Sequence, residues 1–368
     1  MKKVAIVGAG GFVGARFVEM ALLDRDLFTG WEVVPVIRQP RGLGRLSKFG
    51  LTNHRVADAA KPETLVSAFV GCDAVVNLTM GDNTRTLPDV QNLHTGCVAA
   101  KVPLLIHMSS AEVFGRCATP GLNDESPWFS SHWMEYAREK GKAEDWLRAL
   151  PQVPTSVVTL RPGLVWGPRS PWVAGPAQMI FNGSAVLIDD GRWSCNLCHV
   201  DNLIYDILAV IQSANATPGL YNVGDPGRPD WRTYFTGLAA EMGFSDAHFH
   251  LLKESDFKES ILNKIFTMKD VSAAKAIKRR MRSQTKEKIK FWLLKMRRKL
   301  NPPDGVIRRG PNLTKGIWWL QTTRYHLPVT KFQSVFQPAN QLTFAQGVAQ
   351  TGEWLRFSGF SRTEQAVE

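Results

Sequence analysis

Three glycines near the start of the chain place the strongest limit on its fold. Gly8, Gly11 and Gly14 lie in "GAGGFVG", between the apolar run "KKVAIV" and "FVGARFVEMALL", whose apolar residues have helical spacing. A glycine-rich turn between a buried strand and a helix lets the backbone approach a pyrophosphate, whose charge meets the helix N-terminus. A plain tight turn is the alternative, but the flanking strand and helix favour a dinucleotide-binding βαβ unit.

The alternation of strands and helices continues to about residue 225. Further apolar strands are predicted at 31–38, 72–79, 103–110, 155–163 and 219–225, and helices at 90–102, 131–150 and 200–214. This order predicts an α/β fold with a doubly wound parallel sheet covered on both faces. The rhythm breaks after Pro168, and from about Pro226 the chain is helical and irregular, which predicts a smaller, mostly helical C-terminal lobe.

The break in this rhythm suggests a division into two domains. We expect a dinucleotide-binding domain over 1–170, to which 195–225 return. The segments 171–194 and 226–368 would form a substrate-binding lobe.

Composition fits a globular protein that buries a real core, with 44% hydrophobic and 21% charged residues. The first residues look at first like a signal peptide, but glycines crowd the apolar run. No stretch reaches the ~18 apolar residues of a membrane span. Together with five cysteines, an odd number that fits a reducing compartment, this predicts a cytoplasmic protein.

The net charge of +12 comes from one segment. Residues 275–309 hold 14 Lys/Arg and 2 Asp/Glu, so the rest of the chain, with 31 of each sign, is neutral. An apolar stripe with helical spacing, which includes Trp292, runs through the same segment. Such a helix can lie on an anionic membrane, bind nucleic acid, which we consider unlikely, or be an ordinary lobe helix with solvated lysines.

The end of the second strand bears on the choice between NAD and NADP. NAD sites usually place a carboxylate there for the ribose hydroxyls, but this chain has Ile37, followed by Arg38 and Arg41. Arginines can clamp a 2′-phosphate, so NADP is expected, with NAD as the alternative and a solvated basic loop as the plain interpretation. Asp58, in "RVADAAKPETL", can accept from the adenine amino group, cap a helix, or do both.

A hydroxyl and a Tyr/Lys pair are expected to meet at the sheet edge. Ser110 ends the strand 103–110, and Tyr136 and Lys140 lie four residues apart on the following helix. Strand carboxyl ends and the neighbouring helix line the crevice of such a sheet. A nearby ammonium would favour the phenolate, so that Tyr136 can exchange a proton with a carbinol or carbonyl near neutral pH.

These motifs together resemble the extended short-chain dehydrogenase/reductase family, its NAD(P)-dependent epimerase/dehydratase branch, which has a Rossmann-type fold. The landmarks "GAGGFVG", "ADAAKPETL", "DAVVNLT", "HMSSAEVFG", "YAREKGKAE", "LRPGLVWGP", "HVDNL" and "GLYNVGD" occur in the family's order. The resemblance implies catalytic roles for Ser110, Tyr136 and Lys140, with Lys140 also holding the nicotinamide ribose. It also implies cofactor contacts from Phe12, Val13, Ala59, Leu78, Thr79, Pro162 and Val165.

Two positions bear on the substrate. Family dehydratases keep an acidic residue two places after the active-site hydroxyl, and Glu112 lies there, either as a base or as a structural hydrogen-bonding group. Some nucleotide-sugar enzymes carry an arginine for the diphosphate before "HVD". Cys195 occupies that region here, with Arg192 nearby. Ser110, Ala111, Glu112 and Arg192 are therefore the expected substrate contacts.

One motif has a misleading spelling. The segment "CNLCH", from Cys195 to His199, matches the C-x-x-C-H sequence at which haem is attached. However, it coincides with the strand end at which the family has its "HVD" motif. We expect no haem, no metal and no redox disulfide there.

Three functions remain open from the sequence. The first is epimerase or dehydratase chemistry on a carbinol of a sugar-like substrate, nucleotide- or lipid-linked, as in polysaccharide biosynthesis. The second is a net reductase or dehydrogenase of a hydroxysteroid-like or other lipophilic ketone. The third is a non-catalytic dinucleotide-binding protein with a docking tail. A homodimer and peripheral membrane contact through 275–309 are the partner arrangements expected.

Overall fold

The computed structural model describes residues 1–80, 83–116, 121–151, 154–214, 216–244, 249–257, 311 and 313–361. The basic segment 275–309 lies outside these residues. The strands are β1 (Lys2–Val7), β2 (Trp31–Ile37), β3 (Arg55–Val56), β4 (Ala74–Asn77), β5 (Leu104–Met108), β6 (Ser156–Pro162), β7 (Leu164–Trp166), β8 (Val186–Ile188), β9 (Leu197–His199), β10 (Gly219–Val223) and β11 (His250–Leu252).

The α-helices are α1 (Phe12–Leu23), α2 (Pro62–Phe69), α3 (Thr86–Ala99), α4 (Glu135–Arg148), α5 (Pro171–Phe181), α6 (Val200–Gln212), α7 (Trp231–Glu241), α11 (Lys315–Gln321), α12 (Thr330–Phe336) and α13 (Phe344–Phe357). Short 3₁₀ turns include η1 (Pro40–Leu43) and η4 (Ala111–Phe114). Within the described ranges, none of these helices has the length and apolar content needed to cross a bilayer.

A seven-stranded parallel sheet confirms the predicted fold class. Its strand order is β10-β6-β5-β4-β1-β2-β3, so the direction of winding reverses between β1 and β4. Val7 pairs with Asn77 across this reversal, which brings the glycine turn after β1 beside Leu78. Ligands of such sheets bind at the carboxyl ends of the strands at the reversal point.

Each face of the sheet has its own core, because successive side chains of a strand point to opposite faces. Val4 and Ile6 of β1 pack with residues of α1 and α6, whereas Ala5 and Val7 pack with α2 and α3. The strands are therefore apolar at consecutive positions, as expected of a sheet covered on both sides.

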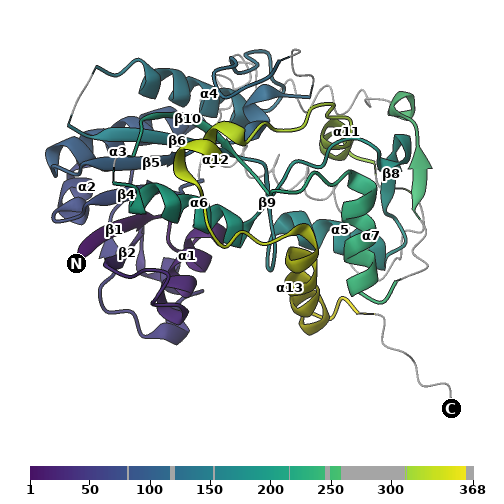
Figure 1. Cartoon of the computed structure of the whole chain (residues 1–368), viewed down its shortest axis with the longest axis horizontal. Helices are drawn as coiled ribbons and strands as arrows, with labels where there is room; N and C mark the ends of the chain where they lie inside the picture. The colour runs from purple at the N-terminus through teal and green to yellow at the C-terminus, as the bar shows by residue number, and fades with distance from the viewer. Residues whose placement is uncertain are drawn as a thin grey trace, which may run out of the picture.

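A second core lies beyond the carboxyl ends of the sheet strands. Trp166, Val173, Leu238 and Val348 belong to it, and α5, α7 and α13 surround it (Figure 1). Two small parallel pairs, β7 with β9 and β8 with β11, complete this lobe.

The C-terminal part of the chain is shared between the two cores. α12 lies beside β10 (Figure 1). Its Phe332 and Phe336 pack edge-on against Tyr221 of β10, within the sheet core. α13 then returns to the lobe and packs on α7. This differs from the division expected from the sequence, in which 226–368 belonged to the lobe as a whole.

A buried carboxylate joins the two cores at the "HVDN" and "VGD" motifs. Asp225 accepts hydrogen bonds from the backbone N–H of His199 (2.6 Å), the amide of Asn202 (2.7 Å) and the indole of Trp166 (2.7 Å). Burying a carboxylate is costly unless it is well paired, so these three donors explain why the motif residues occur together.

Candidate active site

The glycine turn has the shape needed for a dinucleotide. Gly8 has a φ of +88°, and a Cβ at Gly14 would lie 2.4 Å from the Gly8 carbonyl oxygen. Gly11 caps α1 with no side-chain hydrogen bond, so no side chain occupies the N–H groups of the first turn, at Phe12 and Val13. The residues present therefore fit a pyrophosphate at this helix N-terminus.

The loop after β2 lies directly against this turn. A Cβ at Gly10 would come 2.1 Å from the Gly42 carbonyl oxygen, so η1 and the glycine turn touch backbone to backbone. Ile37 is buried, and Arg38 and Arg41 are exposed beside the turn. Among the described residues neither arginine forms an ion pair, although the Arg41 guanidinium donates to the side-chain oxygen of Gln39 (2.8 and 3.1 Å).

The carboxylate of Asp58 closes the turn before α2. Its Oδ1 accepts from the Ala60 N–H (3.0 Å), while Lys61 rather than Asp58 is the N-cap residue of α2. The alternative interpretation of Asp58 as the cap of this helix is therefore wrong, and its contact with the adenine amino group stays a prediction. Asn92 of α3 donates to the Ala59 carbonyl (2.8 Å) and holds this loop beside the sheet edge.

Leu78 and Thr79 directly follow β4, at the carboxyl end of this strand. The Leu78 N–H donates to the Val7 carbonyl (2.9 Å), and Thr79 is fixed through Asn77, whose Oδ1 accepts from the Thr79 hydroxyl (2.6 Å). Pro162 ends β6, and Val165 lies in β7, paired with Cys198. Leu78, Thr79 and Pro162 thus lie at the carboxyl ends of β4 and β6, and Val165 lies in the short strand that follows β6.

Ser110, Tyr136 and Lys140 come together as predicted. Ser110 is the N-cap residue of η4, directly beyond β5, and its side chain hydrogen-bonds to that of Tyr136. The Lys140 ammonium lies 6.0 Å from the centre of the Tyr136 ring and donates to the Met108 carbonyl (2.6 Å). The lysine therefore fastens α4 to the end of β5 and places the phenol beside the serine.

The electrostatics of this trio differ from the sequence-based expectation. Burial raises the pKa of Tyr136 above its usual value and outweighs the Ser110 hydrogen bond, which favours the phenolate. Burial also lowers the pKa of Lys140 to about 8, although the charge of Glu144 favours the ammonium. The protein by itself thus keeps Tyr136 as a phenol, which is suited to donate a proton.

A buried ion pair between Arg161 and Glu144 stabilises the elements that carry Ser110, Tyr136 and Lys140. Arg161 of β6 binds Glu144 in a bidentate manner, with N–O distances of 2.9 and 2.6 Å, and donates to the Asp124 carbonyl (2.7 Å). The Ser109 hydroxyl also donates to Glu144. Because Glu144 lies one turn after Lys140, this network fixes both α4 and the strand end that carries Ser110.

Glu112 has a partner that the sequence did not reveal. Its Oε1 lies 3.0 Å from Nε2 of His132, whose ring is fully buried. His132 precedes α4 by three residues, and its contact with Glu112 depends on how the loop folds back over η4. Tyr325, also unpredicted, donates its hydroxyl to the Ala111 carbonyl (3.3 Å) and brings the C-terminal segment to the same place.

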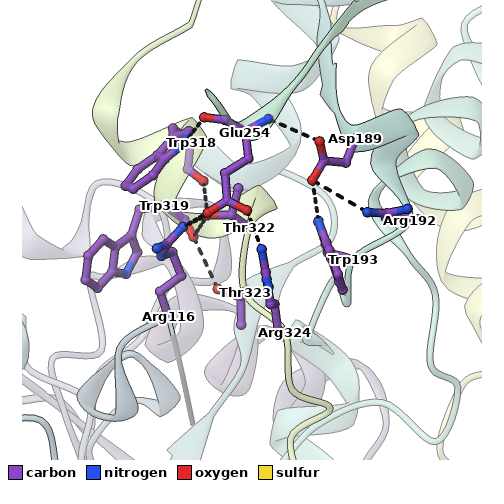
Figure 2. A network of polar contacts seen from close by, with 10 residues as sticks. All are labelled: Arg116, Asp189, Arg192, Trp193, Glu254, Trp318, Trp319, Thr322, Thr323 and Arg324. Carbon is purple, nitrogen blue, oxygen red and sulfur yellow. Dashed lines mark hydrogen bonds and ion pairs between the residues drawn. The ribbon is translucent and has the colours of Figure 1, made fainter. Parts of the chain in front are cut away.

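Arg192 belongs to a separate polar network in the lobe (Figure 2). It lies 3.9 Å from Asp189 and over the ring of Trp193, and its side chain is 66% exposed. Asp189 accepts from the Glu254 N–H, and Glu254 in turn binds Arg116 and Arg324 (Figure 2). Arg192 is thus linked to the η4 region through this network and makes no direct contact with Ser110 or Tyr136.

The cysteines of "CNLCH" are buried in the protein. Burial raises the pKa of both the Cys195 and the Cys198 thiols well above the usual value. Nδ1 of His199 accepts from the Asp201 N–H (3.2 Å) at the start of α6. The motif therefore serves the packing of β9 and α6. Across the described parts of the chain, no cluster of three or more potential metal ligands occurs.

Comparisons with known proteins agree with this geometry. Residues 8–165 match the family described as NAD(P)H-binding. A 2-alkyl-3-oxoalkanoate reductase of Shewanella oneidensis is 28% identical over 236 residues, 58% of each chain. The N-acetyl-alpha-D-glucosaminyl-diphospho-ditrans,octacis-undecaprenol 4-epimerase of Escherichia coli O157:H7 is 25% identical, covering 62% of this chain and 68% of that protein.

Solved structures cover nearly the whole chain. A dTDP-glucose 4,6-dehydratase from Bacillus anthracis, in complex with NAD, has a TM-score of 0.67 at 14% identity, over 98% of this chain and 99% of that one. A UDP-glucuronic acid 4-epimerase from Bacillus cereus has a TM-score of 0.65 at 15% identity, over 97% and 99%. Residues 8–165 are therefore similar to NAD(P)H-binding proteins, and the chain as a whole has the fold of these epimerase and dehydratase structures.

Proposed function

We propose that the chain is an NADP-dependent enzyme that acts on a carbinol or ketone of a sugar-like substrate, with epimerase or dehydratase chemistry. The observation that carries the proposal is the assembly of Ser110, Tyr136 and Lys140 at the carboxyl end of β5, two strands from the glycine turn that follows β1 in the same parallel sheet. A protein that only binds a dinucleotide has no need of this trio.

The cofactor, when bound, supplies or accepts a hydride at the reacting carbon. Gly8, Gly11 and Gly14 would hold its pyrophosphate, Arg38 and Arg41 a 2′-phosphate, and Lys140 the nicotinamide ribose. Tyr136 would give its phenolic proton to the carbonyl oxygen, or take it back from the carbinol. Ser110, hydrogen-bonded to Tyr136, would hold the same oxygen and so fix the direction of proton transfer.

A net reductase of a lipophilic ketone is the second candidate. Burial keeps Tyr136 protonated, which suits donation to a carbonyl oxygen. Aromatic side chains cluster next to η4, where Trp319 packs on His132 and Trp133. The similarity to 2-alkyl-3-oxoalkanoate reductases also favours this candidate, although the matches span 58% and 62% of those proteins.

A substrate panel separates the two candidates. The protein is first screened by thermal shift with nucleotide sugars and with 2-alkyl-3-oxo acids, because a true ligand raises Tm by mass action. Turnover is then followed by mass spectrometry of products and by absorbance of NADPH. Epimerase or dehydratase chemistry gives product without net consumption of cofactor, whereas a reductase consumes one NADPH per product. A panel with neither binding nor turnover contradicts the proposal.

A further inference from the structure

Two tryptophans, called the indole pair below, meet beside η4. Trp133 lies in the loop before α4, three residues before Tyr136, and Trp319 lies in α11. Their ring centres are 6.1 Å apart. Both rings also pack on His132, whose Nε2 lies 3.0 Å from Oε1 of Glu112 in η4. One imidazole ring therefore separates the indole pair from the turn that begins at the reacting hydroxyl.

Both N–H groups of the indole pair lack a hydrogen-bond acceptor. Nε1 of Trp133 and Nε1 of Trp319 are buried, and neither has a partner in the parts of the chain that the structure describes. An indole N–H can only donate, and most buried polar groups in proteins are paired. Two unpaired donors next to each other are therefore unusual, and an acceptor on a ligand would satisfy both.

Neighbouring indoles are paired within the protein. Trp318, next to Trp319 in α11, donates to the Glu254 carbonyl (3.1 Å), and Trp193 donates to the Asp189 carboxylate (3.1 Å) (Figure 2). The indole pair differs from these neighbours, because its two donors find no acceptor among the described residues.

A positive charge lies against the indole pair. The Lys315 ammonium is 5.0 Å from the ring centre of Trp133. Negative charge is favoured beside an ammonium, and hydrogen bonds to an ionised acceptor are stronger than those to a neutral one. A carboxylate meets both conditions. It accepts hydrogen bonds without donating any, and it has two oxygens, one for each indole N–H.

We propose that Trp133 and Trp319 bind a carboxylate of the substrate and so select ligands that carry one in addition to the reacting carbinol or ketone. Each indole N–H would donate to one carboxylate oxygen, while Ser110 and Tyr136 hold the reacting oxygen. This inference rests on the proposed function and deepens it, because it names a substrate class. Uronic acids and 3-oxo acids both belong to that class.

Apolar packing alone is the competing role for the indole pair. Trp231 of α7 shows that an unpaired indole also occurs in the lobe core. Its Nε1 is buried without an acceptor among the described residues, and its ring packs on Tyr234 and Phe235. Packing alone predicts that loss of an indole N–H changes the affinities for acidic and neutral ligands in the same proportion. A carboxylate site predicts that the acidic ligand loses more.

The test compares ligands that differ in the carboxylate. One pair is UDP-glucuronic acid and UDP-glucose, titrated into the full-length protein with NADPH bound. The other is 2-methyl-3-oxobutanoate and its methyl ester, titrated with NADP⁺ bound, so that no hydride transfer occurs in either case. Isothermal titration gives both dissociation constants. In each pair that binds, the wild type should bind the acid at least about tenfold more tightly than its neutral partner.

Matched variants locate the preference. Trp133→Phe and Trp319→Phe keep an aromatic ring without the N–H, and each should reduce the preference for the acid by about fivefold or more. Trp231→Phe removes the unpaired indole of the lobe core and should leave the preference unchanged. Because the ratio of the two dissociation constants is taken within one variant, partial unfolding affects both values alike.

Two results would overturn the inference. One is equal affinity of the wild type for the acid and its neutral partner. The other is a preference for the acid that survives in both Trp133→Phe and Trp319→Phe. Failure of both ligand pairs to bind is a different result, because it contradicts the proposed function on which the inference rests.

Discussion

At the scale of single residues, the sequence predicted which side chains meet but not how their charges balance. Ser110, Tyr136 and Lys140 could be predicted because each lies in a motif that occurs at a fixed place in the order of strands and helices. The direction of the Tyr136 pKa was wrong, because burial outweighs the hydrogen bond with Ser110 and the Lys140 ammonium is directed at the Met108 carbonyl. His132 was missed because a contact across 20 residues depends on loop geometry.

The depressed pKa of Lys140 predicts a pH dependence of cofactor binding. The ammonium is charged below a pH of about 8 and loses its proton as the pH rises through that value. If it holds the nicotinamide ribose, NADPH affinity should fall severalfold between pH 7 and pH 9.5. Fluorescence titration of NADPH measures this directly. Lys140→Arg, which stays charged over this range, should flatten the curve. Identical curves for wild type and Lys140→Arg would remove Lys140 from cofactor binding.

At the scale of elements, strands were predicted well and helix ends less well. Apolar runs such as 31–38 and 103–110 became β2 and β5 because both faces of the sheet are covered. The expected helix 131–150 begins only at Glu135, since Met134 has extended backbone angles. The four residues excluded from the helix include His132. A helix over 131–134 would have carried that ring along the axis of α4 instead of back over η4.

The space around two helical glycines predicts different effects of substitution by alanine. Gly14 of α1 is crowded by the glycine turn, whereas Gly175 of α5 has open space around it. Gly14→Ala places a Cβ 2.4 Å from the Gly8 carbonyl oxygen, so it should lower the free energy of unfolding by about 1–3 kcal/mol and weaken NADPH binding. Gly175→Ala, within α5, meets no atom within 4 Å and should be neutral or stabilising by up to about 1 kcal/mol. Thermal or urea unfolding with a NADPH titration checks both. Equal effects at the two positions would mean that close packing at Gly14 is not the constraint.

The position of η1 against the glycine turn predicts the cofactor preference. Arg38 and Arg41 are exposed there without carboxylate partners among the described residues. NADPH should bind more tightly than NADH, and Arg38→Ala should erase the difference. Arg25→Ala removes the same charge beyond the far end of α1 and should leave the ratio of the two dissociation constants unchanged. Equal affinities of the wild type for NADPH and NADH would contradict the 2′-phosphate clamp.

At the scale of the whole molecule, the order of elements fixed the sheet, but not the path of the C-terminal segment. In the sequence, the aromatic residues of α12 cannot be told apart from those of a lobe helix. Phe332 and Phe336 belong to the sheet core because they pack on Tyr221, a contact between distant parts of the chain. The same holds for Tyr325, which reaches the Ala111 carbonyl across more than 200 residues of chain. Such long-range pairings leave no periodic signal in the sequence.

The basic segment 275–309 carries a prediction that rests on the sequence alone. If it docks on a membrane, the protein should co-sediment with anionic vesicles but not with neutral ones. Binding should weaken steeply with salt, since each basic residue near the surface is worth about 1 kcal/mol and is screened. Trp292→Ser should reduce binding even at low salt. Deletion of the segment should leave NADPH affinity unchanged. No vesicle binding at low salt would favour an ordinary lobe helix, and preference for RNA a nucleic-acid role.

The central claim is that η4, α4 and the glycine turn assemble one catalytic unit around Tyr136. Its most direct test is Tyr136→Phe, measured for turnover and for NADPH affinity on the substrate that the panel identifies. The phenol handles the proton, whereas Lys140 and the glycines hold the cofactor. Turnover should therefore fall by at least about a hundredfold while the dissociation constant of NADPH changes little. A variant that keeps most of its rate, or that loses turnover only because it no longer binds NADPH, would contradict the account.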